Sequence, residues 1–345
     1  MSRLIESYPH LGELPPLLRD TVTGTPDRRP GSVRRTATID MVWTTREEPM
    51  QLIGRARDLV TPANGDARTL AEASMNATIV GYRKIGSLEV TPHRENIGDL
   101  VGCVGGSDLR TAIERALPGE REAATPLYLL LDDIAGTSLI GGFVWSRHGN
   151  AMWSRERRKQ NGESPMEFGI RKGRIICSGL RPNGWADTHR MEEEDPEHGL
   201  WPAGDISTPN DPLGWHELPP NPKIGMRRHR RIDLWREGGN IQVDAFFRDS
   251  SWDPDGTENA LHEYDVRSVI DGETHNLISI TATPHVLPFP ECRWAAPHTA
   301  TLVGHHVDTF RVRVQQELTE LHACTHLNDM LRALAEVPTM IDALD

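Results

Sequence analysis

Residues 230–250, RRIDLWREGGNIQVDAFFRDS, give the clearest indication of the fold of this chain. Apolar and polar side chains alternate on both sides of Gly238-Gly239, which is typical of two strands joined by a tight turn. A second stretch of this kind, LHEYDVRSVIDGETHNLISITATPHV, occupies residues 261–286 and turns at Asp271-Gly272. The two stretches predict four antiparallel strands.

Two helices are expected after these strands. Apolar residues recur at helical spacing from Val303 to Val307, Phe310, Val314 and Leu318. A last helix is expected from about Thr325 to Leu334, with Pro338 breaking or kinking it. We expect Thr325 to be its N-cap residue. The inward-facing residues of this helix are predicted to be Leu327, Met330, Leu331 and Leu334.

The same plan occurs twice along the chain. TATIDMVW at 36–43 resembles RRIDLW at 230–235, and Arg57-Asp58 recurs as Arg248-Asp249 at an offset of 191 residues. Thr91-Pro92-His93 recurs as Thr283-Pro284-His285. Because the order is kept, we interpret the chain as an internal duplication. The predicted fold is α+β: an antiparallel-sheet-plus-two-helices unit in two copies, packed as a pseudo-dimer with a long insert.

The predicted boundaries follow from this repeat. They give an N-terminal arm at 1–30, a first copy at 31–145, an insert at 146–225 and a second copy at 226–345. The insert is rich in Pro and Gly and carries Trp153, Trp185, Trp201 and Trp215. Tryptophan is costly to leave in water, so a lid packed on the body is favoured over a free linker.

Composition excludes several classes of protein. A net charge of −12 over 345 residues argues against a nucleic-acid binder. No apolar run is long enough for a membrane span, and the first residues carry no secretion signal, so no membrane role is expected. Four scattered cysteines indicate reduced thiols in the cytoplasm rather than a disulfide framework.

Candidate site residues are those that only the second copy carries, because residues shared by both copies are explained by the shared fold. Shared in this sense are Arg57-Asp58 and Arg248-Asp249, which we interpret as a strand-end ion pair. The residues specific to the second copy are His262, Tyr264, Cys292, Cys324 and His326. The first copy has Ala71, Ala73, Ala124 and Pro126 in place of His262, Tyr264, Cys324 and His326.

These residue types suit two kinds of chemistry. Cys324 stands at a helix start, where the dipole favours thiolate, and Cys292, Cys324 and His326 make a plausible zinc or iron site. His322 could reach the same space, and Cys177 could complete the site if the insert folds over it. Buried cysteines that only fill space are the alternative.

Acid–base chemistry is the second kind. His262 and Tyr264 share one face of a strand, and imidazole titrates near neutral pH. With His326 they are the predicted catalytic residues.

The basic run at 227–231 has two interpretations. It leads into Ile232-Asp233-Leu234-Trp235, which is predicted to be an edge strand kept soluble by positive charge. Alternatively Arg227, Arg228 and Arg230 could bind the anionic end of a small-molecule substrate. No nucleotide cofactor is expected, because Gly102-Cys103-Val104-Gly105-Gly106 lacks dinucleotide-loop spacing.

Five motifs resemble a bacterial family described as a domain of unknown function. They are MRRHRRIDLW, VDAFFRDS, LHEYDV, TPHVLPFPEC and CTHLNDMLR. The resemblance extends over nearly the whole chain, including PGSVRRTATIDM at 30–41 and the ICSG turn of the insert. Such members are typical of bacteria that degrade lipids, steroids or aromatic compounds, which implies a catabolic role. Cys324-Thr325-His326-Leu327 also resembles the thiolate-bearing helix start of iron–sulfur scaffold proteins, although Ala323 stands where the scaffold has histidine.

Two main hypotheses result. The first is a lyase or hydrolase that acts on a partly apolar organic acid or aromatic compound. The second is a non-catalytic metal or iron–sulfur carrier, which predicts exposed ligands and a docking partner. A module in which Cys and His are core residues is the third alternative. Oligomeric state stays open, with a homo-oligomer compatible with the sequence.

Overall fold

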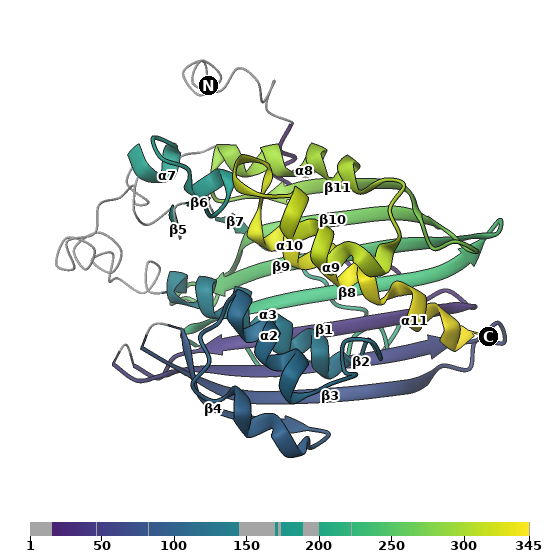
Figure 1. Cartoon of the computed structure of the whole chain (residues 1–345), viewed down its shortest axis with the longest axis horizontal. Helices are drawn as coiled ribbons and strands as arrows, with labels where there is room; N and C mark the ends of the chain where they lie inside the picture. Colours follow the sequence, from purple (N-terminus) through teal and green to yellow (C-terminus); the bar gives the residue numbers. More distant parts are fainter. Residues whose placement is uncertain are drawn as a thin grey trace.

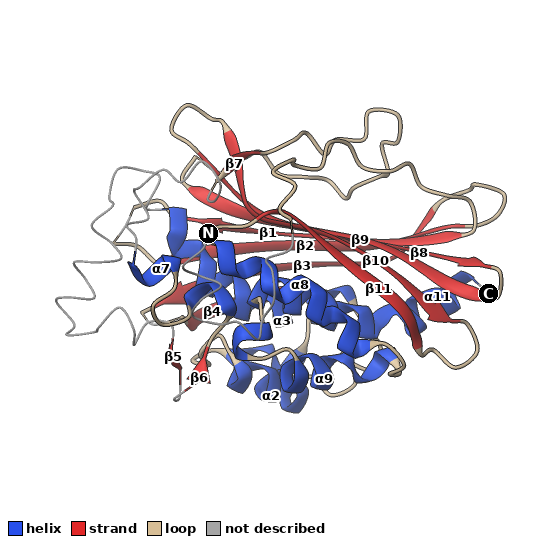
Figure 2. Cartoon of the chain, turned by 90° about the horizontal axis from the view of Figure 1, so that it is seen from above, coloured by secondary structure: helices blue, strands red, loops and turns tan. Residues whose placement is uncertain are grey.

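A single antiparallel sheet with helices on one face forms the body of the protein (Figures 1 and 2). The computed structural model describes residues 16–45, 47–81, 83–144, 170–171, 174–188, 200–221 and 223–344. Its main strands are β1 (Ser32–Val42), β2 (Met50–Thr61), β3 (Arg68–Val80), β4 (Lys84–Thr91), β8 (Gly225–Glu237), β9 (Asn240–Trp252), β10 (Glu258–Asp271) and β11 (Leu277–Val286). The predicted α+β class is confirmed.

Strand order shows how the two halves join. It runs β11-β10-β9-β8-β1-β2-β3-β4, so each half is a meander and the halves meet where β8 pairs with β1. The register there is reciprocal: Arg34 lies opposite Asp233, and Asp40 lies opposite Arg227. Both pairs form salt bridges. A reciprocal register is what a pseudo-dimer requires, while descent by duplication stays an interpretation of the sequence.

The expectation that residues 232–235 form an edge strand is wrong. Strand β8 pairs with β9 on one side and with β1 on the other, so it lies at the centre of the sheet. Its arginines are buried because carboxylates from neighbouring elements neutralise them, a compensation that the local run of charge does not reveal.

Helices of both halves pack on the same face of the sheet (Figure 2). The helices are α2 (Ser107–Ala116), α3 (Pro126–Ile140), α8 (Ala295–His298), α9 (Phe310–Glu317), α10 (Thr325–Ala333) and α11 (Val337–Ile341). Between them and the sheet lies one core, which includes all four residues predicted to face inward from the last helix. Among the described residues, no helix is long and apolar enough to cross a membrane.

Helix boundaries differ from the expectations at three places. Residues 303–309 are turns and a short 3-10 segment, so α9 begins only at Phe310. Cys324, not Thr325, is the N-cap residue of α10, and Thr325 is the first helical residue. Pro338 opens α11 in the first turn, where its missing N–H costs nothing, rather than kinking a longer helix.

Described parts of the insert lie on both faces of the sheet. Residues 174–188, with η4 (Ser178–Leu180) and α7 (Trp185–Thr188), pack on the helix side. Residues 200–221, with the two-residue strand β7 (Trp201–Pro202), cover the opposite face, where Trp215 packs on Phe246. Strands β5 (Ile170–Arg171) and β6 (Arg174–Ile175) form a separate ribbon. Trp153 lies outside the described residues.

Candidate functional site

Side chains from five segments come together where α10 begins above β9 and β10. Strand β9 supplies Asp249, β10 supplies His262 and Tyr264, and α10 supplies Cys324 and His326. Cys292 comes from the 3-10 helix η5 (Pro290–Trp294), and Cys177 directly precedes η4. We call these seven residues the second-half cluster, since six of them lie in the second half and Cys177 in the insert.

Strand register explains why the strand residues come together. His262 lies opposite Asp249, and Tyr264 lies opposite Phe247. Residues two apart on a strand share a face, so His262 and Tyr264 both point to the helix layer. Glu263 points to the other face, where it pairs with Arg248.

Asp249, His262 and His326 form the tightest part of the cluster. One ligand atom from each lies within 4.8 Å of the others. Nε2 of His326 is 3.5 Å from Oδ2 of Asp249, and the two imidazole rings stack with centroids 3.5 Å apart. All three side chains are buried. We call this group the His–His–Asp triad.

Both imidazoles of the triad are neutral at ordinary pH. Burial, followed by the nearby Arg228 guanidinium, lowers the pKa of His326 to about 3. Burial and the neighbouring His326 hold the pKa of His262 well below its usual value. A neutral imidazole keeps a nitrogen lone pair that can bind a metal ion or accept a proton. Nδ1 of His262 has no hydrogen-bond partner in the described part of the chain.

Arg228 holds the Asp249 carboxylate beside these rings. The guanidinium donates from Nε and Nη2 to the two carboxylate oxygens, at 2.8 and 2.9 Å. A carboxylate offers about four lone-pair directions, so two such bonds leave it able to bind a metal ion as well. The stacked rings direct their lone pairs in nearly parallel planes. Metal binding therefore requires one ring to turn out of the stack.

Thiols and the Tyr264 hydroxyl occupy the other part of the cluster. Burial, together with the neighbouring Cys324, raises the pKa of Cys177 to about 12. Burial also raises the pKa of Cys292 and Cys324 above the usual thiol range. The predicted metal ligands Cys292, Cys324 and His326 are thus divided between two adjoining groups: the sulfurs stand with Tyr264, and His326 stands with Asp249 and His262.

The predicted substrate-binding arginines are buried and bound to carboxylates. Arg227 binds Asp40 and two proline carbonyls, Arg228 binds Asp249, and Arg230 binds both oxygens of Asp133 at 2.7 and 2.9 Å. Arg228 and Arg230 belong to a buried network between sheet and helices. Its members are Arg35, Arg110, Arg228, Arg230, Arg311, Arg332, Asp58, Asp132, Asp133, Asp249, Asp329 and Glu336.

Two pairings in the sequence-based interpretation need correction. Arg57-Asp58 and Arg248-Asp249 are not ion pairs within each dipeptide, because neighbouring strand residues point to opposite faces. Asp58 pairs with Arg35, as Asp249 pairs with Arg228. His322 does not reach the cluster: it stacks on His298 with centroids 3.8 Å apart, and both rings are partly exposed.

Asp249 is the site residue that sequence reasoning missed. Because Asp58 matches it, comparison of the two copies assigns the carboxylate to the fold alone. The register of the β9–β10 hairpin holds the signal that could have found it, since pairing the strands places Asp249 opposite His262. A residue shared by both halves can still take part in a site that only one half completes.

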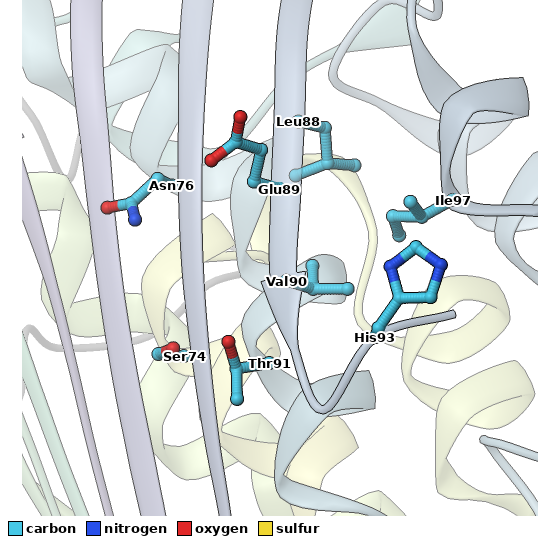
Figure 3. A pocket seen from close by; sticks show the side chains of 8 residues that line it. All are labelled: Ser74, Asn76, Leu88, Glu89, Val90, Thr91, His93 and Ile97. Carbon is cyan, nitrogen blue, oxygen red and sulfur yellow. The ribbon is translucent and has the colours of Figure 1, made fainter. Parts of the chain in front are cut away.

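A surface pocket in the first half offers less chemistry. It has a volume of about 350 Å³ and lies between β3, β4 and the 3-10 helix η2 (Glu95–Leu100). Figure 3 shows its lining side chains, among them Asn76, Glu89 and His93. These three side chains are exposed, so water screens their charges and satisfies their hydrogen bonds. The buried second-half cluster is therefore the better candidate site.

Comparison with known proteins gives one match. Residues 226–340, about a third of the chain, match the model of a family described as "Protein of unknown function (DUF2889)". For these residues the match agrees with the family of unknown function that the sequence motifs indicate. No curated protein and no solved structure matches the chain. The matched residues are those of the second half, where the cluster lies, and the description of the family assigns no activity.

Proposed function

We propose that this protein is an enzyme of the lyase or hydrolase type, acting on a small, partly apolar organic acid or aromatic compound in the cytoplasm. Its centre is the His–His–Asp triad. One observation carries the proposal: two neutral histidines and a carboxylate lie buried together, and one ring nitrogen has no partner among the described residues. Buried polar atoms without partners are rare in folded proteins, and some of them mark groups that act in catalysis or bind an ion.

The donor set fits a divalent metal ion. Two imidazoles and a carboxylate are ligands of zinc in hydrolytic sites and of non-haem iron. Asp249, His262 and His326 would hold such an ion, which would polarise a carbonyl or activate water. The state of Nδ1 of His262 supports the fit, because a buried nitrogen lone pair gains a partner when it binds metal.

Proton transfer is assigned to the chain's own residues. A neutral imidazole accepts a proton from water or substrate without first losing one. The Asp249 carboxylate, positioned by Arg228, can stabilise the imidazolium that forms on His326. The Tyr264 hydroxyl lies on the same strand face as His262 and is the next proton donor along the strand.

A carrier is the second candidate, and burial disfavours it. A carrier must hand its metal or cluster to a partner at its surface. Here Asp249 is 0% exposed, His262 is 4% exposed and His326 is 7% exposed. Closed surroundings suit chemistry on a small molecule, because exclusion of water strengthens every electrostatic interaction in the site.

Metal binding by the triad provides the first test. Untagged, chelator-treated protein is titrated with Mn²⁺ in a calorimeter, because Mn²⁺ prefers oxygen and nitrogen ligands over sulfur. We expect binding that Asp249→Asn and His262→Gln each weaken about 10-fold or more. The matched control is Asp58→Asn, which removes the equivalent partner of Arg35 and should leave Mn²⁺ affinity unchanged. Absence of binding, or equal loss in the control, contradicts a metal centre at the triad.

A second test addresses catalysis itself. Small-molecule extracts of the native host are incubated with metal-loaded wild-type protein and with the Asp249→Asn variant, and compared by mass spectrometry. We expect an organic acid or aromatic compound to be consumed by the wild type alone. If no compound changes in a broad set of extracts, the enzyme proposal is contradicted.

A further inference from the structure

Three of the chain's four cysteines, Cys177, Cys292 and Cys324, are buried in the segments that form the contact between the insert and the second half. The amide and hydroxyl of Ser178 both donate hydrogen bonds to the carbonyl oxygen of Ala323, at 2.9 and 3.0 Å. Ser178 directly follows Cys177, and Ala323 directly precedes Cys324. These two bonds therefore hold Cys177 beside the start of α10.

Cys292 lies against the same short piece of insert. A Cβ atom added to Gly179 would stand 2.5 Å from Sγ of Cys292, so only glycine lets the backbone come this close. Two residues further on, Arg181 forms a fully buried salt bridge with Glu291, which also accepts a hydrogen bond from the amide of Trp185. Specific polar bonds thus fix the contact between the insert and the second half on either side of the cysteines.

Tyr264 supplies an independent observation. Its side chain is 0% exposed, and its hydroxyl makes no hydrogen bond of ordinary geometry in the described part of the chain. The thiol of Cys324, a weak acceptor, offers it only a poor substitute. The hydroxyl lies beside the sulfur of Cys324, the residue that follows the Ala323 carbonyl to which Ser178 is bonded. A buried hydroxyl without a partner of ordinary geometry is unfavourable, so the space beside it is a candidate place for a ligand.

Simple burial of cysteine as a small apolar residue explains less. It accounts for one thiol in a core, but it does not favour three thiols from distant segments around a polar hydroxyl. Cys324 also stands at the N-cap of α10, where Ser, Thr, Asp and Asn are the usual choices, and the amides of His326 and Leu327 are directed at its sulfur. Amides in this position favour the thiolate form, which is the form that binds a metal ion. A ligand shared by the three sulfurs explains all of these features.

We propose that Cys177, Cys292 and Cys324 bind a thiophilic metal ion that clamps the insert onto the second half. Three thiolates select soft or borderline ions such as Zn²⁺, in contrast to the imidazole and carboxylate donors of the triad. Each thiol loses its proton to solvent when the ion binds. Among the described residues only the triad has its ligand atoms all within 4.8 Å, so the thiol side chains rotate toward the shared ion.

Cobalt spectroscopy tests this site. The full chain is stripped with chelator and titrated with Co²⁺, whose bonds to thiolate give charge-transfer absorption in the near ultraviolet. We expect this absorption in the wild type, with Cys177→Ser, Cys292→Ser and Cys324→Ser each reducing it and weakening Co²⁺ binding about 10-fold or more. Cys103→Ser is the matched control, because Cys103 lies in the first half, and it should behave as wild type.

A measurement on the wild-type chain covers the case in which a serine variant fails to fold. Iodoacetamide labelling with and without Zn²⁺ is followed by peptide mass spectrometry. Zn²⁺ should protect Cys177, Cys292 and Cys324 from labelling and leave Cys103 unprotected. Equal labelling of all four cysteines, a disulfide among the three, or Co²⁺ bound without thiolate absorption overturns the proposal.

The experiments test the thiol site and the triad through separate signals, so one proposal can be contradicted while the other stands. Asp249→Asn and His262→Gln should lose Mn²⁺ binding but keep the cobalt–thiolate absorption. Cys177→Ser should show the reverse. Loss of both signals in every variant contradicts two distinct sites.

Discussion

The two halves of the sheet carry the same ion pair at the same place. In the first half Arg35 donates to both oxygens of Asp58, at 2.6 and 2.5 Å, and in the second half Arg228 does the same to Asp249 at 2.8 and 2.9 Å. What lies opposite the aspartate differs: Ala71 in the first half and His262 in the second. The halves therefore share the charge pair and differ in the residues that could use it.

The helices that cover the two ion pairs, α3 and α10, differ in the residue at their N-cap. Thr125 caps α3 through a hydrogen bond that its side chain accepts from the amide of Tyr128. Cys324 is the N-cap residue of α10, one place before Thr325, the residue that matches Thr125 in the repeat. The amides of His326 and Leu327 are directed at its sulfur. The first half thus has a hydroxyl at its helix cap, while the second half has a thiol. Differences of this kind separate requirements of the fold from requirements of the site.

Replacing the arginine of the ion pair in either half should have the largest effect on the stability of the protein. We expect Arg35→Ala and Arg228→Ala each to lower the free energy of unfolding by about 3–5 kcal/mol, since each leaves a buried carboxylate without its partner. Urea unfolding of both variants measures this. If one variant loses less than about 1 kcal/mol, the two ion pairs are not equivalent.

Acid should destabilise the protein through histidines that only the second half carries. Burial lowers the pKa of His326 to about 3, whereas unfolded histidine titrates near 6.5. The stability that this neutral ring provides is present above pH ~6.5 and is lost as pH falls toward 3, by up to about 1.4 kcal/mol per pH unit. Urea unfolding at several pH values should show a shallower acid loss in His326→Gln.

Two matched controls belong to this pH measurement. His93→Gln replaces an exposed histidine of the first half and is measured in parallel as the control for loss of a histidine outside the core. His216 and His229 are also buried with lowered pKa, so part of the acid loss should persist in His326→Gln. Identical slopes in wild type and His326→Gln would contradict burial of a neutral His326.

The contact between insert and second half gives a smaller effect. Gly179→Ala places a methyl group against Cys292 and Phe289, which should cost about 1–3 kcal/mol of unfolding free energy. Gly98→Ala in the first half meets no described atom within 4 Å and should change stability by less than about 0.5 kcal/mol. Equal stabilities of the two variants would show that the insert does not pack as described.

Tyr264→Phe should have the smallest effect on stability in the absence of metal. It removes a buried hydroxyl that makes no hydrogen bond of ordinary geometry to the described residues, so the free energy of unfolding should stay the same or rise by up to about 1 kcal/mol. Chelator-treated protein and thermal unfolding measure this change. A loss of 1 kcal/mol or more would mean that the hydroxyl has a strong partner in the folded chain.

Local patterns were enough to predict most of the fold. Alternation around Gly238-Gly239 predicted β8 and β9, and the apolar spacing of the last helix placed Leu327 and Met330 in the core. The central place of β8 could not be predicted in this way. Whether a strand with several arginines is an edge depends on carboxylates from β1 and α3, which are distant in sequence, as well as from the adjacent β9.

The candidate site, like the fold, was predicted only in part, because some of its contacts depend on how separate elements pack. Differences between the two halves singled out His262, Tyr264, Cys324 and His326, which the structure brings together with Cys292 and Cys177. They could not show that His326 joins Asp249 rather than the thiols. That division depends on which side of α10 faces β9, a packing relation that spacing along one helix does not contain.

Anomalous X-ray scattering from crystals grown with Mn²⁺ would compare the two halves within one molecule and so decide where the chemistry lies. We expect a manganese peak between Asp249, His262 and His326, and none at the equivalent place beside Asp58 and Ala71. Manganese beside Asp58, or a triad without a peak in crystals that bind the ion elsewhere, would contradict the assignment of the chemistry to the second half.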